Sequence, residues 1–193
     1  MAPVAASAGQ NRPARQRGNL SGMHPSARHV ADVLASLGAT GEVRELPEPA
    51  PTAAAAAAQL GCEIGAIANS LIFDADGVPL LILTSGAHRV DTEWVAKQLD
   101  LGSVRRANPE FVRSATGQAI GGVAPVGHPS PVRTLVDSWL QRYAVVWAAG
   151  GHQNMVFPTS YDELLRITGG EPAEVSAESP PPGASRFSVP FGQ

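Results

Sequence analysis

The chain has 193 residues, of which 44% are hydrophobic and 16% are charged, and its formal net charge is −3. This length suffices for one domain with a buried core, and the apolar runs are strand-sized, which excludes a membrane span of about 18 apolar residues. The single cysteine, Cys62, excludes an internal disulfide and a thiolate metal cluster; we interpret it as a small core residue in a reducing, cytoplasmic compartment.

The charge is unevenly distributed. Residues 1–23 carry three arginines and no acid, whereas residues 24–176 carry ten basic and sixteen acidic side chains, a net charge of −6. A domain with this charge is not suited to long nucleic-acid backbones, because such binding depends on Lys and Arg contacts to phosphates. We therefore expect no DNA binding, although the end of one strand can still enter a pocket. Arg105, Arg106 and Arg113 form a basic cluster that we interpret as a solvated face.

Both ends of the chain are predicted to be disordered tails. Residues 1–23 lack hydrophobic periodicity, and no apolar run follows their arginines as a secretory signal requires. Residues 177–193 begin a proline-rich stretch of the same kind. The sequence thus predicts one domain over residues 24–176 and leaves open whether Met1 or Met23 is the first residue.

Capping residues and hydrophobic periodicity define the first elements. A helix with Ser26 as its N-cap is predicted to end at Gly38. A short strand over residues 42–46 is stopped by prolines, and Thr52 then caps an alanine-rich helix that Gly61 closes.

A β-hairpin is predicted next. Residues 69–74 and 79–84 are strands, and the Asp-Gly pair within residues 75–78 is a strong hairpin signal. A helix over residues 90–99, capped by Asp91 or Thr92, and a strand over residues 103–107 follow.

Shorter elements complete the domain. Pro109 begins a brief helix through Ser114, and Ala119 and Ile120 read as the end of an apolar strand. The remaining elements are strands over residues 132–136, 145–148 and 155–157, a helical turn over 137–142 and a helix over 160–168. Many short strands among three or four longer helices predict the α+β class with a mixed, curved sheet. Neither the dinucleotide-binding glycine pattern nor a Walker loop is present.

The most informative stretch is a glycine loop within residues 116–129. Gly121 and Gly122 permit a positive φ or close approach of bare backbone, Pro125 fixes one φ, and Gly127 permits a second reversal. Such a loop offers uncovered amide N–H groups, as the binding of a carbonyl or an oxyanion requires. A tight turn between strands is the alternative interpretation.

The order and spacing of four segments resemble the YbaK/prolyl-tRNA-synthetase-associated family of aminoacyl-tRNA deacylases. These segments are the loop over 121–128, the strand over 68–73, and residues 85–91 and 147–152, and the likeness extends over about residues 24–176. The resemblance implies a partly closed, barrel-like mixed sheet with helices around it, and trans-editing, the hydrolysis of a mischarged aminoacyl-tRNA ester, without metal or organic cofactor. It implies the acceptor end of tRNA as partner, with an aminoacyl-tRNA synthetase as a further candidate.

The chain departs from the family pattern at Asn69, where the family usually has a lysine that deacylation needs. Lys97, on a predicted helix, is the only lysine. One interpretation is that Asn69 hydrogen-bonds an acyl or ribose oxygen while other groups perform the chemistry; the other is a module that binds aminoacyl-tRNA or a synthetase without cleaving it. The intact glycine loop favours the first. A hydrolase of small esters or amides on the same scaffold is a third possibility.

The resemblance also suggests roles for individual residues. The amides of Gly121 through Gly127 are assigned to oxyanion or acyl-carbonyl binding, with the terminal ribose hydroxyl of the tRNA helping to activate water. Ala149 and Val156 stand where cysteine-specific relatives carry Ser and Asp, which argues against cysteine specificity. The candidate substrate-binding residues are Ser70, Arg89, His128, Gly150, Gly151 and His152.

Arg89 is the candidate for a phosphate contact, and Gly150 and Gly151 resemble the second glycine pair of the family, which faces the pocket. His128 and His152 are either acid/base groups or parts of surface loops. A zinc site formed by His88 with these two histidines is disfavoured, because no pair has ligand spacing. No nucleophile elbow presents Ser70 or Ser85 for a Ser–His–Asp mechanism.

Overall fold

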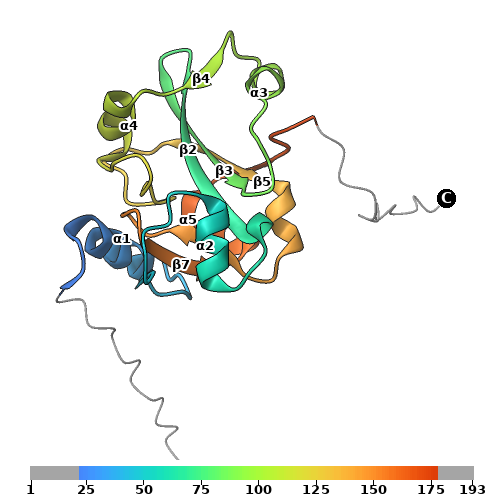
Figure 1. The fold of residues 1–193 in the computed structure, drawn as a ribbon. Coiled ribbons are helices and arrows are strands. Elements are labelled where there is room, and N and C mark those ends of the chain that lie inside the picture. Colours follow the sequence, from blue (N-terminus) through green and yellow to red (C-terminus); the bar gives the residue numbers. More distant parts are fainter. Residues whose placement is uncertain (1–21, 178–193) are drawn as a thin grey trace, which may run out of the picture.

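The computed structural model describes residues 22–177. The predicted disordered tails lie outside the described residues, except for residues 22, 23 and 177. The described part is an α+β structure in which helices surround one mixed β-sheet (Figure 1), as the sequence predicts.

The helices are α1 (Pro25–Ser36), α2 (Ala53–Leu60), α3 (Thr92–Gln98), α4 (Pro109–Thr116), α5 (Tyr161–Thr168) and the short 3-10 helices η2 (Ile64–Ala66) and η3 (Ser138–Arg142). The strands are β1 (Arg44–Glu45), β2 (Ile67–Ala75), β3 (Val78–Ser85), β4 (Val104–Arg106), β5 (Arg133–Asp137), β6 (Val146–Ala149), β7 (Met155–Thr159) and β8 (Glu171–Ala173).

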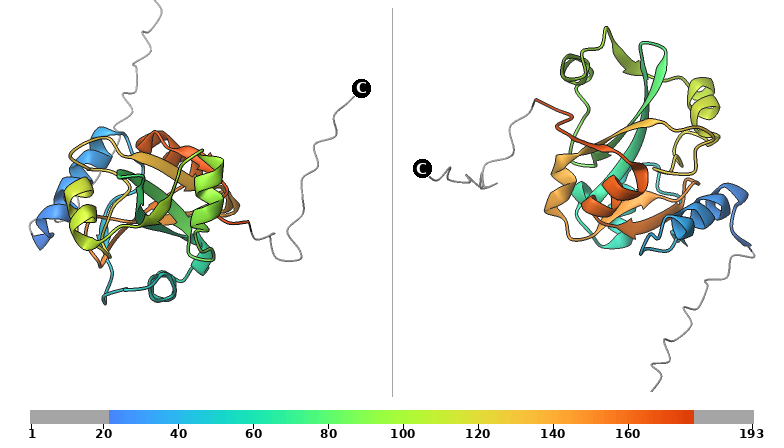
Figure 2. Two further views of the ribbon diagram at one scale, coloured as in Figure 1. Left: turned by 90° about the horizontal axis from the view of Figure 1, so that it is seen from above. Right: turned by 180° about the vertical axis from the view of Figure 1, so that it is seen from behind.

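The sheet has the strand order β1-β7-β6-β2-β3-β5-β8, with β4 paired to β2 beside this path. The β2–β6, β3–β5 and β5–β8 pairs are parallel, and the other pairs are antiparallel. Because β1 and β8 end the path without pairing with each other, the sheet is open. The β2–β3 hairpin extends between α3 and α4, as both the front view and the view from behind show (Figure 2).

One edge of β2 is divided between two partners. β3 pairs with β2 along residues 68–75, so β6 and β4 share the opposite edge. β6 pairs with residues 67–68 and β4 with residues 73–75. Between them, residues 69–72 have no strand partner on that edge, and the sheet splits there.

Side chains that alternate along β2 and β3 point to opposite faces of the sheet, and each face has its own hydrophobic cluster. Ile72, Leu81 and Leu83 belong to a cluster that also contains residues from α1, α4 and α5. A second cluster contains residues of α3 together with Phe73, Leu80 and Ile82, each of which is adjacent in the chain to a member of the first cluster. A third cluster lies under α2, and Cys62 packs against it half-buried, as expected of a small core residue.

Most of the expected turns and caps are confirmed. Ala75 pairs with Val78 across a two-residue turn in which Asp76 and Gly77 have φ values of 51° and 88°. Thr52 caps α2, and Asp91 accepts hydrogen bonds from two amides at the start of α3.

Three local expectations were wrong or incomplete. The cap of α1 is His24 and not Ser26, because Pro25 occupies the first helical position and the Nδ1 of His24 accepts from the Ser26 amide. Ala119 and Ile120 lie in a turn after α4, not at a strand end. The sequence analysis also missed η2 and β8.

Candidate functional site

A cavity of about 320 Å³ lies along the split edge of β2. Every residue from Ile67 to Phe73 lines it, on both sides of the strand alternation, because the cavity meets the edge of β2 and not one face of the sheet. The other walls are the start of α2 with the residues before it, the turn at 120–123, residues 106–107, and β6 and β7 with the loop that joins them.

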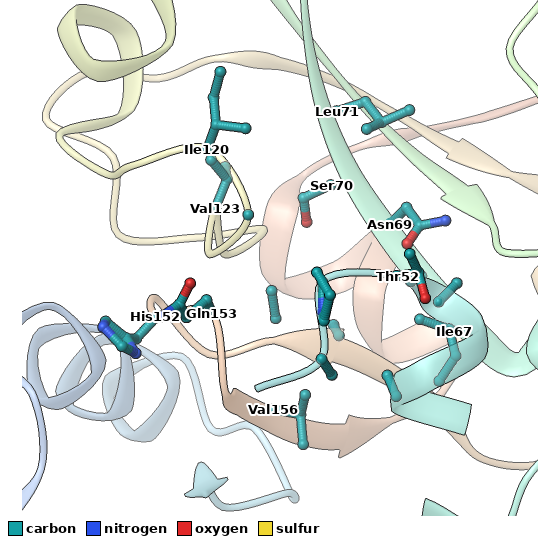
Figure 3. A pocket seen from close by; sticks show the side chains of 18 of the residues that line it. Thr52, Ile67, Asn69, Ser70, Leu71, Ile120, Val123, His152, Gln153 and Val156 are labelled. Atoms are coloured by element: carbon teal, nitrogen blue, oxygen red, sulfur yellow. The ribbon is translucent and has the colours of Figure 1, made fainter. Parts of the chain in front are cut away.

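Two polar side chains of β2 reach this cavity. Ser70 lies between Asn69 and Val123 in the close view (Figure 3). The hydroxyl oxygen of Ser70 is buried and has no hydrogen-bond partner within the described residues. A buried hydroxyl without a partner costs free energy, so this oxygen marks a place where a ligand can supply the missing hydrogen bond.

The glycine loop supplies main-chain donors to the same cavity. Gly121 lines the cavity with a φ of 91°, and Val123 lines it beside Gly121. Neither amide has an acceptor among residues 22–177, whereas the amide of Gly122 bonds to the Ala119 carbonyl at 3.1 Å. One wall of the cavity therefore contains Gly121 and Val123, whose amides have no acceptor among residues 22–177, and another contains Ser70 and Asn69.

The glycine pair at 150–151 serves packing and does not line the cavity. A Cβ on Gly150 would lie 2.8 Å from Val43, and one on Gly151 would lie 2.8 Å from the Ser26 carbonyl oxygen. These glycines let the β6–β7 loop pack against the core and α1. A Cβ on Gly122 would lie 2.7 Å from the backbone of His152, so the two glycine loops touch each other.

The later residues of the glycine loop lie behind the cavity. Pro125 is buried, and Gly127 has a φ of 84°; neither lines the cavity. The Nε2–H of His128 donates to the Ala124 carbonyl at 2.9 Å, because a carbonyl oxygen can only accept. Burial lowers the pKa of His128 below its ordinary value of 6.5, which keeps the imidazole neutral.

His152 lines the cavity, but its ring points toward α1 and away from Ser70 and Asn69 (Figure 3). The ring lies 4.4 Å from that of His24, and its Nδ1 bonds to the side-chain oxygen of Asn154 at 2.7 Å. This placement does not present the imidazole to a ligand beside Ser70.

Arg89 is exposed on the loop after β3 and does not line the cavity. Its neighbour His88 bonds through Nδ1 to the buried carboxylate of Asp137 at 2.9 Å. Ser85 lies in the same cluster, but its hydroxyl donates to the Gly65 carbonyl at 2.7 Å, so it is not a free nucleophile. Within residues 22–177 no group of three or more His, Cys, Asp or Glu side chains could hold a metal ion.

Sequence reasoning missed much of the cavity wall. Arg106 lines the cavity, and its guanidinium has no carboxylate partner in the described part of the chain. The apolar wall includes Trp147. The guanidinium carbon of Arg44 lies over the Trp147 ring, 4.0 Å from its centroid. The sequence indicated Arg106 only as a member of the basic cluster. No local pattern predicts that Trp147 lines the cavity, because its position depends on the pairing of β6 with β2.

None of the helices in residues 22–177 has the combination of length and hydropathy needed to cross a bilayer.

Comparison with known proteins gives a consistent result. Residues 47–167 match the family model of the aminoacyl-tRNA editing domain. The proline–tRNA ligase of Lysinibacillus sphaericus (strain C3-41) is 30% identical over 112 residues, which cover 58% of this chain and 20% of the ligase. YwhH of Bacillus subtilis (strain 168) is 30% identical over 128 residues, which cover 66% of this chain and 81% of YwhH. The chain thus spans about a fifth of the ligase and most of YwhH.

The fold is also similar to that of solved structures. A crystal structure described as a candidate trans-editing enzyme for prolyl-tRNA synthetase aligns with a TM-score of 0.75 and 39% identity, covering 81% of this chain and 99% of that chain.

Proposed function

The chain belongs to the aminoacyl-tRNA editing domain family, and on this premise we propose that it hydrolyses the ester bond of a mischarged aminoacyl-tRNA. One observation supports this proposal most directly. The residues that line the cavity include Gly121 and Val123, whose amides have no acceptor within residues 22–177, and Ser70, whose buried hydroxyl has no partner there. These are donors for an ester and its oxyanion.

The chemistry requires little from the protein, because an aminoacyl ester is already activated. A water attacks the acyl carbonyl, the carbon–oxygen bond to the ribose breaks, and the ribose oxygen takes a proton, which yields a free amino acid and intact tRNA. The amides of Gly121 and Val123 stabilise the negative charge that develops on the carbonyl oxygen. The neighbouring ribose hydroxyl of the substrate assists the water.

Asn69 and Ser70 hold the substrate on the β2 side. The carboxamide of Asn69 has no hydrogen-bond partner within residues 22–177, so it is free to bind an acyl or ribose oxygen. Ser70 binds a second polar group of the same aminoacyl-ribose unit, which removes the cost of its buried hydroxyl.

In this proposal Arg106, and not Arg89, contacts a phosphate group of the tRNA. It lines the cavity, whereas Arg89 does not. An arginine at the cavity suits a phosphate of the acceptor strand, because guanidinium groups form charge-assisted hydrogen bonds with phosphate oxygens.

The test is incubation of the full chain with a panel of charged tRNAs, followed by measurement of the amino acid released. Release from at least one mischarged tRNA, above the rate without protein, supports the proposal. Retention of the ester, with protection from spontaneous hydrolysis, would instead indicate a non-catalytic binding module, the alternative that Asn69 motivates. Turnover of small esters with no response to tRNA would contradict both.

A further inference from the structure

The glycine loop is held mainly through its carbonyl oxygens. The side chains of Gln118, His29 and His128 each donate a hydrogen bond to one carbonyl of the loop, at 2.9 to 3.3 Å. The accepting carbonyls are those of Ala124, Val126 and Gly127. These three bonds fix the part of the loop that follows Gly121 and Val123, the two residues of the loop that line the cavity with unpaired amides.

Gln118 contacts the loop at two points. Its Nε2 donates to the Val126 carbonyl at 3.3 Å, and its Oε1 accepts from the Ala124 amide at 2.7 Å. The side chain is only 5% exposed, so these two bonds satisfy a carboxamide that is buried in the loop.

The last turn of α4 fixes the position of Gln118. The amide of Gln118 donates to the hydroxyl of Thr116 at 3.1 Å, and that hydroxyl donates to the Val112 carbonyl at 2.7 Å. The carboxamide therefore joins the loop to the end of α4, through one bond of 2.7 Å and one of 3.3 Å.

From these contacts we propose that Gln118 is a positioning residue, which holds the loop so that the amides of Gly121 and Val123 face the substrate. This inference rests on the proposed function, because it assumes that these amides bind the ester carbonyl. Gln118 does not line the cavity, so it acts through the loop and not by contact with the substrate.

Two variants separate the bonds, and one serves as control. Gln118→Met keeps the length of the side chain and loses both bonds, whereas Gln118→Glu keeps an acceptor for the Ala124 amide and loses the donor. Thr134→Val is the matched control, because Thr134 is also 5% exposed and donates one bond to a backbone carbonyl, at 2.9 Å, away from the cavity. We expect both substitutions to lower the melting temperature, and Gln118→Met to lower it more, because it also leaves the buried Ala124 amide without an acceptor.

The first measurement is amide hydrogen exchange, resolved by NMR, in the free protein. We expect Gln118→Met to speed exchange of the hydrogen-bonded loop amides, those of Gly122 and Ala124, by roughly tenfold or more, since local opening becomes easier. Thr134→Val should leave these rates unchanged. Wild-type exchange rates in Gln118→Met would overturn the inference.

The second measurement is deacylation of a tRNA that the wild type hydrolyses. We expect Gln118→Met to lower kcat roughly 10- to 100-fold with little change in KM, because displaced amides no longer meet the oxyanion. Gln118→Glu should fall between this variant and the wild type, and Thr134→Val should keep the wild-type kcat. An unchanged kcat in Gln118→Met would contradict the inference. If the wild type releases no amino acid from any tRNA, the proposed function fails, and amide exchange alone then decides whether Gln118 holds the loop.

Discussion

Asn69 presents a neutral carboxamide at the point where the pairing of β6 with β2 stops. An amide can donate and accept hydrogen bonds, but it brings no charge to bind phosphate or to stabilise an oxyanion. In the proposed mechanism, stabilisation of the oxyanion passes to the amides of Gly121 and Val123. The only lysine, Lys97, lies on α3 and outside the cavity wall, so it cannot replace the missing charge.

Replacement of Asn69 tests this division of roles. Asn69→Leu has a similar shape and no hydrogen-bonding groups, so we expect kcat/KM for deacylation to fall roughly tenfold, the value of one neutral hydrogen bond. Asn69→Lys serves as the comparison in the same assay. Activity that arises only in Asn69→Lys would show that the native chain binds without cleaving.

Gly121 tests the open amides directly. Its φ of 91° is costly for a side chain, by about 1–3 kcal/mol, although no atom lies within 4 Å of the place where a Cβ would stand. We expect Gly121→Val to abolish deacylation and to keep the far-UV circular dichroism spectrum of the wild type. Undiminished turnover in this variant would remove the oxyanion assignment.

Arg106 tests the phosphate contact. We expect Arg106→Gln to raise KM several-fold at constant kcat, and to reduce the slope of log affinity against log salt by about 0.7, the value of one contact to a single strand. Arg105→Gln is the matched control, because Arg105 is the adjacent exposed arginine of β4 and does not line the cavity. Equal effects of the two substitutions would indicate a general effect of charge.

The two glycine loops pack directly against each other. Gly122 lies directly against the backbone of His152 and Gln153, and the loop at 150–153 in turn packs on α1. Figure 3 shows Gln153 facing the cavity from this second loop. The cavity wall thus depends on a close contact between two backbones.

Gly122→Ala would disturb this contact. The added methyl group would lie 2.7 Å from the His152 backbone, closer than real Cβ atoms approach, so the loops must separate. We expect the free energy of unfolding to fall by about 1–3 kcal/mol, as in other overpacked sites, and deacylation to fall with it. Urea denaturation and the tRNA assay measure both quantities. Full stability in this variant would mean that the loops separate without cost.

The elements were largely predictable because their signals are local. Asp76 and Gly77 form the expected hairpin turn, and Thr52 and Gly61 bound α2 as expected. The exceptions have physical reasons. β8 contains Pro172 and forms only by parallel pairing with β5, which no local pattern indicates.

The site was predictable where the family resemblance or a glycine pattern marks it. Asn69, Ser70 and Gly121 line the cavity, and a strand motif or a glycine pattern pointed to each of them. Arg106 and Trp147 could not be found, because β4 and β6 reach the cavity only by pairing with β2. Arg106 pairs with Phe73, 33 positions earlier, and Trp147 pairs with Ile67, 80 positions earlier.

Stability at acidic pH depends on a carboxylate that joins distant parts of the molecule. Glu163 on α5 accepts hydrogen bonds from the Thr40 amide at 2.9 Å and the Thr159 hydroxyl at 2.8 Å. Burial raises the pKa of Glu163, but these hydrogen bonds outweigh it, so the pKa lies below its ordinary value of 4.5. The stabilisation is therefore present above pH 4.5 and is lost as the pH falls through the lower folded-state pKa.

We expect the free energy of unfolding to decline as the pH falls below 4.5, and Glu163→Gln to show a smaller decline in the same range. Urea denaturation at about pH 7 and about pH 3.5 measures this difference. The same pH dependence in both proteins would show that other groups cause it.

The parallel pairing of β2 with β6 joins Ile67 to Trp147 and Ala68 to Ala148. During synthesis, Asn69 and Ser70 leave the ribosome long before β6 and β7 exist, so a nascent chain carries the β2 wall of the cavity without the opposite wall. Contacts between such distant segments also slow folding, because closing a long loop costs entropy before any contact repays it. An uncompleted chain therefore lacks the cavity in which we propose that the end of a tRNA binds, even though it already contains Asn69 and Ser70.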